Sequence, residues 1–183
     1  MAQFRIVTVG SEARKLGKTS LACSLISRFS ERRWCAVKVT PHTHGAAAGL
    51  HIHQEFVQGP SDTGRFLAAG AAESFLVQAE ASEVAQAISD VRGRIASDRL
   101  LVIESTAAMI TCPDALRLLF LAPSERRCEV KPYAADARQR AHAFIGTTTP
   151  AFATQVQPFL AVEPPDYCSP NLLEFVRSRL SLG

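Results

Sequence analysis

The sequence lacks any long apolar run and any strong charge imbalance, and each absence excludes a class of protein. Its longest apolar stretches, 100–103 and 116–122, are far shorter than the ~20 residues of a membrane-spanning helix. The 20 basic and 17 acidic residues leave a formal charge of +3, without the basic stripe typical of nucleic-acid-binding proteins. We therefore expect no membrane and no nucleic-acid partner. Because the N-terminus shows no export signal, it predicts a cytoplasmic protein.

Cysteine is sparse and unpaired. Five cysteines are scattered along 183 residues, and none forms a CxxC pair. These spacings favour reduced thiols over a disulfide framework or a structural zinc site. The length and the 47% apolar content are typical of one domain with a sizeable core, so we expect residues 1–183 to form a single domain.

Strand-like and helix-like segments alternate along the chain. Apolar and β-branched residues predict strands over 4–9, 34–40, 74–78, 100–103, 116–121 and 159–162, with a further short strand over 51–57. Helical spacing predicts helices over 17–29, 61–69, 82–95, 134–143 and 171–182, capped in three cases by Ser61 or Asp62, by Ser82 and by Ser169. This alternation favours an α/β fold, a three-layer α/β/α arrangement around a mostly parallel sheet.

The most specific motif follows the first predicted strand. Residues 10–20 read GSEARKLGKTS, so that a Gly-Lys-Thr opens a predicted helix directly after a loop. This context is typical of the phosphate-binding loop of P-loop NTPases, where helix N–H groups and the lysine neutralise phosphates and the hydroxyl binds Mg²⁺. The residues expected to bind ATP or GTP are Gly10, Lys15, Gly17, Lys18, Thr19 and Ser20. Residues 146–149 lack the Asn/Thr-Lys-x-Asp pattern of ordinary GTPases, which leaves the base open.

The loop departs from the standard spacing at one position. Glu12 stands where a glycine is expected six residues before Lys18, and taking Gly10 instead makes the loop two residues longer. Because a carboxylate repels a triphosphate, Glu12 is expected to point outward or to pair with Arg14 or Lys15. A binding protein with a decayed loop is the alternative that this irregularity leaves open.

Two acidic residues are candidates for holding Mg²⁺ together with Thr19. Glu104 ends an apolar strand, where P-loop proteins carry a magnesium-holding acid. Asp62 lies at the start of a predicted helix, where it either serves the metal or caps the helix. We expect Lys18 and Glu104 to be the catalytic pair. No convincing general base is visible, so catalysis would rest on positioning and charge neutralisation.

Four motifs within residues 4–106 follow one another in the same order as in a known protein family. They are GKTSL, the Lys38 segment VKVTPHTHG, the segment from Asp62 to Arg65 with a following Gly-Ala, and LLVIES. Together they resemble the molybdopterin-guanine dinucleotide biosynthesis protein B family, small P-loop proteins of the SIMIBI class. The resemblance implies GTP or ATP binding with Mg²⁺, slow hydrolysis, a homodimer, and an accessory role beside a cofactor-maturation enzyme.

A second resemblance keeps another activity open. Dethiobiotin synthetase is similar in its long acidic loop ending in Gly-Lys-Thr and in its strand-two lysine. This resemblance implies a small-molecule kinase or ligase. In such an enzyme Lys38 would hold a carboxylate or a γ-phosphate, and Arg65 would add positive charge to the site.

Histidines gather after the second predicted strand. Four of the five lie within twelve residues, namely His42, His44, His51 and His53. In extended chain, residues two apart share a face, so the imidazoles could bind Zn²⁺ or Ni²⁺, as in a metallochaperone GTPase of the nickel-insertion type. Alternatively, His42 and His44 contact substrate or phosphate, and the others lie on a solvated loop.

Overall fold

One sheet runs through the part of the chain that the structure, a computed structural model, describes: residues 4–41, 49–123, 129–147 and 157–180. Its eight strands lie in the order β3-β4-β2-β5-β1-β6-β7-β8. The strands are β1 (Ile6–Ser11), β2 (Trp34–Thr40), β3 (His51–Glu55), β4 (Glu73–Gln78), β5 (Leu100–Glu104), β6 (Ala115–Phe120), β7 (Ala143–Gly146) and β8 (Phe159–Ala161). The helices are α1 (Lys18–Arg28), α2 (Asp62–Ala68), α3 (Val84–Arg94), α4 (Ala108–Thr111), α5 (Ala134–Arg140) and α6 (Pro170–Arg177).

The sheet is parallel except at one edge. Every neighbouring pair of strands runs parallel apart from β3, which pairs antiparallel with β4. The chain moves from β1 to β2 on one side, returns through β5, and continues through β6 on the other side of β1. Such a reversal leaves a crevice outside the carboxyl ends of the central strands, which is where open α/β sheets bind ligands.

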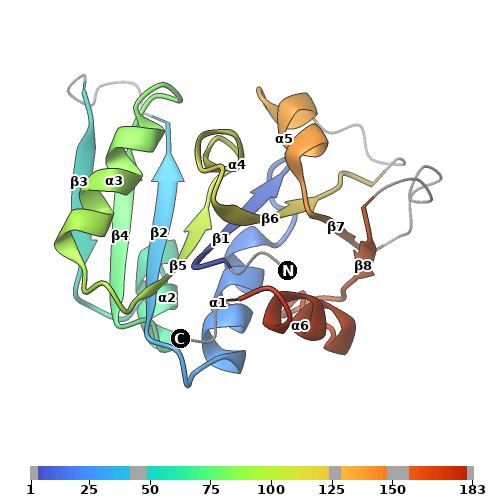
Figure 1. Ribbon diagram of the computed structural model, residues 1–183, viewed down its shortest axis with the longest axis horizontal. Helices are drawn as coiled ribbons and strands as arrows, with labels where there is room; N and C mark the ends of the chain where they lie inside the picture. The colour runs from blue at the N-terminus through green and yellow to red at the C-terminus, as the bar shows by residue number, and fades with distance from the viewer. Residues whose placement is uncertain (1–3, 42–48, 124–128, 148–156, 181–183) are drawn as a thin grey trace.

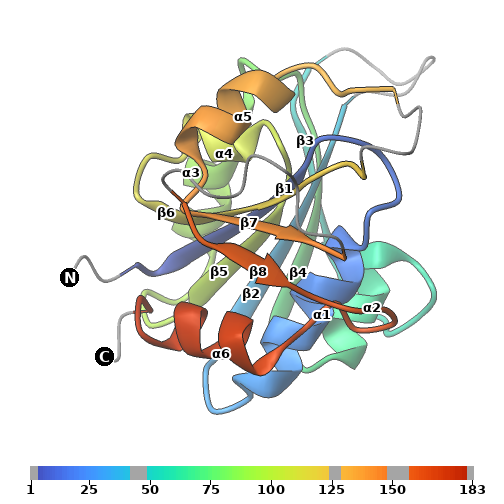
Figure 2. The same ribbon diagram turned by 90° about the vertical axis from the view of Figure 1, so that its right-hand side faces the viewer.

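Helices cover both faces of the sheet (Figures 1 and 2). In Figure 2, α1, α2 and α6 lie below the sheet, while α3, α4 and α5 lie above it. The hydrophobic clusters follow the same division, since one joins α1, α2 and α6 to the sheet and the other two join α3, α4 and α5 to it. This architecture confirms the predicted fold class, a three-layer α/β/α fold with a mostly parallel sheet.

Burial explains why the sequences of the central strands are almost continuously apolar. All residues of β1 and β5 are buried, because helices pack on both of their faces. Leu21, Leu25 and Ile26 of α1 are fully buried against Val7 and Val9 of β1. Full burial of each such side chain contributes roughly 1.5–3 kcal/mol, so the β1–α1 unit that carries the Gly-Lys-Thr motif is firmly anchored.

Some predicted helix ends are confirmed and others are wrong. Ser61 caps α2 and Ser169 caps α6 through their side chains, as expected. Ser82 does not cap α3, whose N-cap is Glu83 with no side-chain cap bond. The helix predicted over 134–143 ends at Arg140, because Ala143 pairs with β6 as the first residue of a buried strand. Sheet formation outweighed local helix propensity there.

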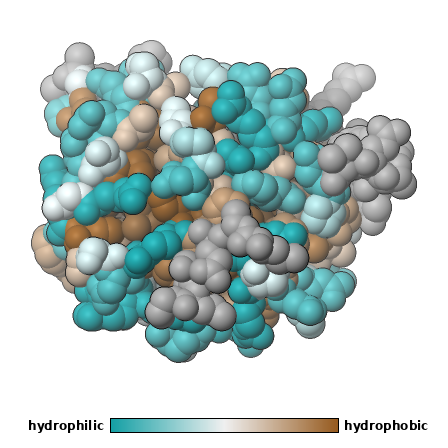
Figure 3. Space-filling model, in the orientation of Figure 1, coloured by the Kyte–Doolittle hydropathy of each residue, from teal (hydrophilic) through white to brown (hydrophobic). Residues whose placement is uncertain are grey.

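Figure 3 shows how hydrophobic and hydrophilic residues are distributed over one face of the molecule. Hydrophobic residues appear mainly in the centre and left of that face, where the surface dips, and hydrophilic residues surround them. Within the described ranges, no helix has both the length and the apolar character needed to cross a bilayer.

Candidate functional site

The loop between β1 and α1 is shorter than the sequence suggested. Since β1 extends to Ser11 and α1 begins at Lys18, the loop consists of residues 12–17. The expectation that it starts at Gly10 is wrong: Gly10 lies inside β1, where an added Cβ would collide with the sulfur of Met109. Gly10 therefore serves packing of the strand and does not form part of the loop.

Glu12 is almost fully buried and binds residues far along the chain. Its carboxylate accepts hydrogen bonds from Ala122 N at 2.9 Å and from Arg138 Nε at 2.7 Å. The expected partners, Arg14 and Lys15, are exposed, and neither forms a hydrogen bond or an ion pair with Glu12. The prediction of a local partner is thus corrected. A partner 126 residues away neutralises Glu12 and removes the repulsion expected toward a phosphate.

Gly17 caps α1 in a conformation that suits glycine. Its φ of 99° lies in the left-handed region, which side chains disfavour. The ring of Tyr167 covers it, and an added Cβ would lie 2.6 Å from the ring carbons. The first N–H groups of α1 have no partner within the helix, so this turn presents donors next to Lys18 and Thr19.

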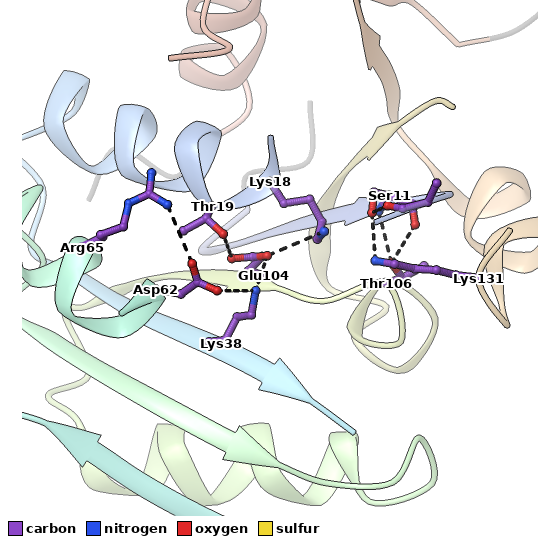
Figure 4. Close-up of polar contacts among 10 residues, drawn as sticks. Ser11, Lys18, Thr19, Lys38, Asp62, Arg65, Glu104, Thr106 and Lys131 are labelled. Carbon is purple, nitrogen blue, oxygen red and sulfur yellow. Dashed lines mark hydrogen bonds and ion pairs between the residues drawn. The ribbon is translucent and has the colours of Figure 1, made fainter. Parts of the chain in front are cut away.

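Lys18, Thr19 and Glu104 meet at the carboxyl edge of the sheet (Figure 4). Thr19 Oγ1 donates to Glu104 Oε2 at 2.7 Å, and Lys18 Nζ lies 3.8 Å from Glu104 Oε1. The Glu104 side chain is only 1% exposed. Strand β5 lies between β1 and β2, and this order brings Glu104 to the N-terminus of α1.

Lys38 and Asp62 complete this cluster from the other side. Lys38 Nζ lies 2.5 Å from Glu104 Oε1 and 2.9 Å from Asp62 Oδ2, so one ammonium bridges two carboxylates. Parallel pairing aligns Lys38 of β2 with Glu104 of β5. Because Ser61 caps α2, Asp62 is not needed as a cap, and its carboxylate is directed to Lys38.

The pKa shifts reflect this arrangement of charges. Burial alone would lower the pKa of Lys38, but Glu104 and Asp62 outweigh it and hold that pKa above its usual value. Burial likewise opposes ionisation of Asp62, yet its bond to Lys38 holds its pKa below the usual range. Burial, only partly offset by Glu104, lowers the pKa of Lys18. Lys18 is therefore the less well compensated of these two lysines.

Arg65 and Ser20 extend the cluster along α1 and α2. Arg65 donates to Ser20 Oγ at 3.2 Å, and its guanidinium lies 3.8 Å from Asp62 Oδ1. Lys15, by contrast, is exposed at a φ of 57°. The structure therefore brings Arg65 and Ser20 to the cluster, whereas Lys15 forms no hydrogen bond or ion pair with it.

Sequence reasoning missed Lys131, which lies between β6 and α5. Its Nζ donates to Ser11 Oγ at 2.9 Å, close to Lys18 (Figure 4). No motif surrounds it in the sequence. The only sequence signal is that it is one of four lysines in the chain and that the other three belong to the expected site.

The structure describes only two of the four histidines that the sequence singled out as a cluster. His42 and His44 lie outside the described residues, while His51 and His53 are exposed on the edge strand β3. Within 4–41, 49–123, 129–147 and 157–180, no three His, Cys, Asp or Glu side chains form a metal-binding group. A Zn²⁺ or Ni²⁺ site at this loop stays a prediction.

The donor set around Lys38 fits a magnesium ion bound with phosphates. Thr19 supplies a hydroxyl, and Glu104 and Asp62 supply carboxylates that already converge on one cation, the Lys38 ammonium. Mg²⁺ favours such oxygen ligands, and it commonly takes only one or two carboxylates alongside phosphate oxygens and water.

Comparison with known proteins identifies no family. No family model matches the chain, and no curated protein matches it. One similar solved structure is LpxK from Aquifex aeolicus, solved in complex with ATP, at 15% identity and a TM-score of 0.49. The match covers 84% of this chain and 52% of that one, so the chain spans about half the length of that structure.

Proposed function

We propose that this protein is a P-loop NTPase that binds a purine nucleoside triphosphate with Mg²⁺ at the end of β1. The observation that carries the proposal is the meeting of Lys18, Thr19 and Glu104 at the N-terminus of α1. Lysine, hydroxyl and acid are the three side-chain types with which P-loop proteins hold phosphates and magnesium.

Each residue has a role that follows from its position. The N–H groups of α1 and the Lys18 ammonium stabilise the negative charge of the β- and γ-phosphates. Thr19, Glu104 and Asp62 hold Mg²⁺. When bound, the ion neutralises charge that develops on the phosphate oxygens. Lys38 then becomes available to a γ-phosphate or to an anionic second substrate, because Mg²⁺ competes with it for the same carboxylate oxygens.

Two activities are compatible with such a site. In the first, the chain hydrolyses nucleotide slowly and serves as an accessory protein in molybdopterin-dinucleotide-like cofactor biosynthesis, as the family resemblance implies. In the second, it transfers a phosphoryl group to a small acid or alcohol. The observation that supports the second activity is that Lys38, Asp62 and Arg65 lie together on one side of the cluster. The two cations there would hold an anionic acceptor. Rapid turnover only with an added acceptor would favour the second activity.

Thermal unfolding with ATP, GTP and Mg²⁺ tests nucleotide binding. A ligand at about 100 times its Kd adds about 2.7 kcal/mol, which corresponds to roughly 5–11 °C for a domain of this size. We expect this shift in the wild type and its loss in Lys18→Ala. Arg94→Met is the control, since Arg94 is an exposed arginine at the far end of α3. Equal shifts in wild type and Lys18→Ala would refute the site.

A homodimer and a metal ion at the histidine loop are two further proposals, and each has its own test. A homodimer is checked by sedimentation of the protein with and without nucleotide. The metallochaperone alternative requires that Ni²⁺ or Zn²⁺ stabilise the wild type and not a His42→Ala/His44→Ala double variant. Equal metal effects on both proteins would exclude that loop as the metal site.

A further inference from the structure

Lys131 reaches the phosphate loop from a segment that no motif marks. Its Nζ donates to Ser11 Oγ at 2.9 Å, and that hydroxyl in turn donates to Ala13 O at 2.6 Å. Figure 4 shows Lys18 between Lys38 on one side and Lys131 on the other. The ammonium of Lys131 therefore borders the loop opposite the carboxylate pair.

Glu12 holds the Lys131 segment against the loop. Lys131 N donates to Glu12 O at 2.8 Å, which fixes the backbone beside the side chain in question. The Glu12 carboxylate, only 6% exposed, accepts hydrogen bonds from Ala122, just after β6, and from Arg138 of α5. Residues on both sides of Lys131 are thus tied to one loop residue, so the position of its side chain is built into the fold.

The charges that act on Lys131 are mainly positive, since Lys18 and Lys38 outnumber the single carboxylate of Glu104. Among the described residues, no carboxylate forms an ion pair with Lys131, whereas Lys18 is a close neighbour of the same sign. Burial, together with Lys18, lowers the pKa of Lys131 to about 7. Even a half-buried ammonium is costly without an ion-pair partner, and a hydroxyl is a weak partner for it. A polyphosphate beside Lys18 would supply the missing negative charge.

Resting on the nucleotide-binding function proposed above, we propose that Lys131 is a second phosphate-binding lysine, positioned by Glu12 and acting with Lys18. Its ligand is the polyphosphate part of a nucleoside di- or triphosphate. This assignment also explains the irregular loop: Glu12 stands where the motif has glycine because its carboxylate ties the loop to the segment that delivers Lys131.

Binding measurements on Lys131→Met and Lys131→Arg test the proposal. A charge-assisted hydrogen bond predicts that Lys131→Met binds ATP and ADP about 10- to 100-fold more weakly, with little change for AMP, and that Lys131→Arg recovers part of the loss. Arg94→Met controls for net charge. Loss of AMP affinity equal to that of ATP, or unchanged ATP affinity, would overturn the assignment.

Inorganic tripolyphosphate separates this proposal from nucleotide binding itself. If wild type binds ATP, Lys18→Ala does not, and Lys131→Met binds as wild type does, the nucleotide site stands and the Lys131 assignment fails. If wild type binds tripolyphosphate, Lys131→Met does not, and neither protein binds nucleotide, the Lys131 assignment stands and the nucleotide-binding proposal fails.

Glu12→Gln tests the positioning role. The amide keeps a bond to Ala122 but loses the charge that holds Arg138. We expect weaker ATP binding than in the wild type, and no further loss when Glu12→Gln is added to Lys131→Met, because both act through one contact. Additive losses in the double variant would contradict a positioning role for Glu12.

Discussion

Replacing Lys38 by methionine removes the cation that bridges two carboxylates. Lys38 Nζ lies 2.5 Å from Glu104 and 2.9 Å from Asp62, and the Glu104 side chain is 1% exposed. Methionine retains most of the side-chain volume but has neither the charge nor the N–H donors of the ammonium. The substitution therefore measures how much that ammonium contributes to the free energy of unfolding.

The magnitude follows from the burial of the three partners. Breaking a buried ion pair by removing one member typically costs ~3–5 kcal/mol. The cost is smaller here, because Asp62 is 40% exposed and Lys18 lies 3.8 Å from the same Glu104 oxygen. We expect a loss of about 2–3 kcal/mol, or roughly 4–12 °C in melting temperature.

Thermal and urea unfolding at neutral pH measure this loss, first with a chelator and then with Mg²⁺. Mg²⁺ is expected to stabilise Lys38→Met more than the wild type, because the ion replaces the missing cation between the carboxylates. The double variant Lys38→Met/Glu104→Gln should recover much of the loss, since it leaves no uncompensated buried charge at Glu104. Wild-type stability of Lys38→Met in the chelator would refute the reasoning.

Two further predictions concern the loop and its pH dependence. Gly17→Ala should cost about 2–4 kcal/mol in thermal unfolding, because the φ of 99° and the Tyr167 ring both oppose a Cβ; an unchanged melting temperature would contradict this geometry. Nucleotide affinity, measured by calorimetry, should fall as the pH rises from 7 to about 9. Without ligand, Lys131 loses its proton near pH 7, whereas a bound polyphosphate favours the charged form, so binding takes up a proton in this window. The charged groups that act on Lys131 are Lys18, Lys38 and Glu104. Lys131→Met should show a flatter profile between these pH values, and an equally steep one would exclude Lys131 as the source.

Local patterns were enough to predict most of the elements. The alternation of buried strands and amphipathic helices predicted a three-layer fold, because a parallel sheet needs helical crossovers. The sequence also predicts the Gly-Lys-Thr at the start of α1 and the acid at the end of β5, because each motif has a fixed place relative to its own helix or strand. Where a short segment fits either a helix or a strand, as at Ala143, the prediction failed, because the partner strand β6 decided the outcome.

The sequence by itself determined that a helix opening with Gly-Lys-Thr follows the first strand, although not the bounds of the loop between them. It also determined the candidate residues, because each depends on nearby residues or on the common direction of parallel strands: Lys18, Thr19, Lys38, Asp62 and Glu104. Only the tertiary structure decided the partner of Glu12 and the presence of Lys131 beside Lys18. These contacts join residues more than a hundred positions apart. No local pattern encodes them, because they depend on how β6 and α5 pack against the loop.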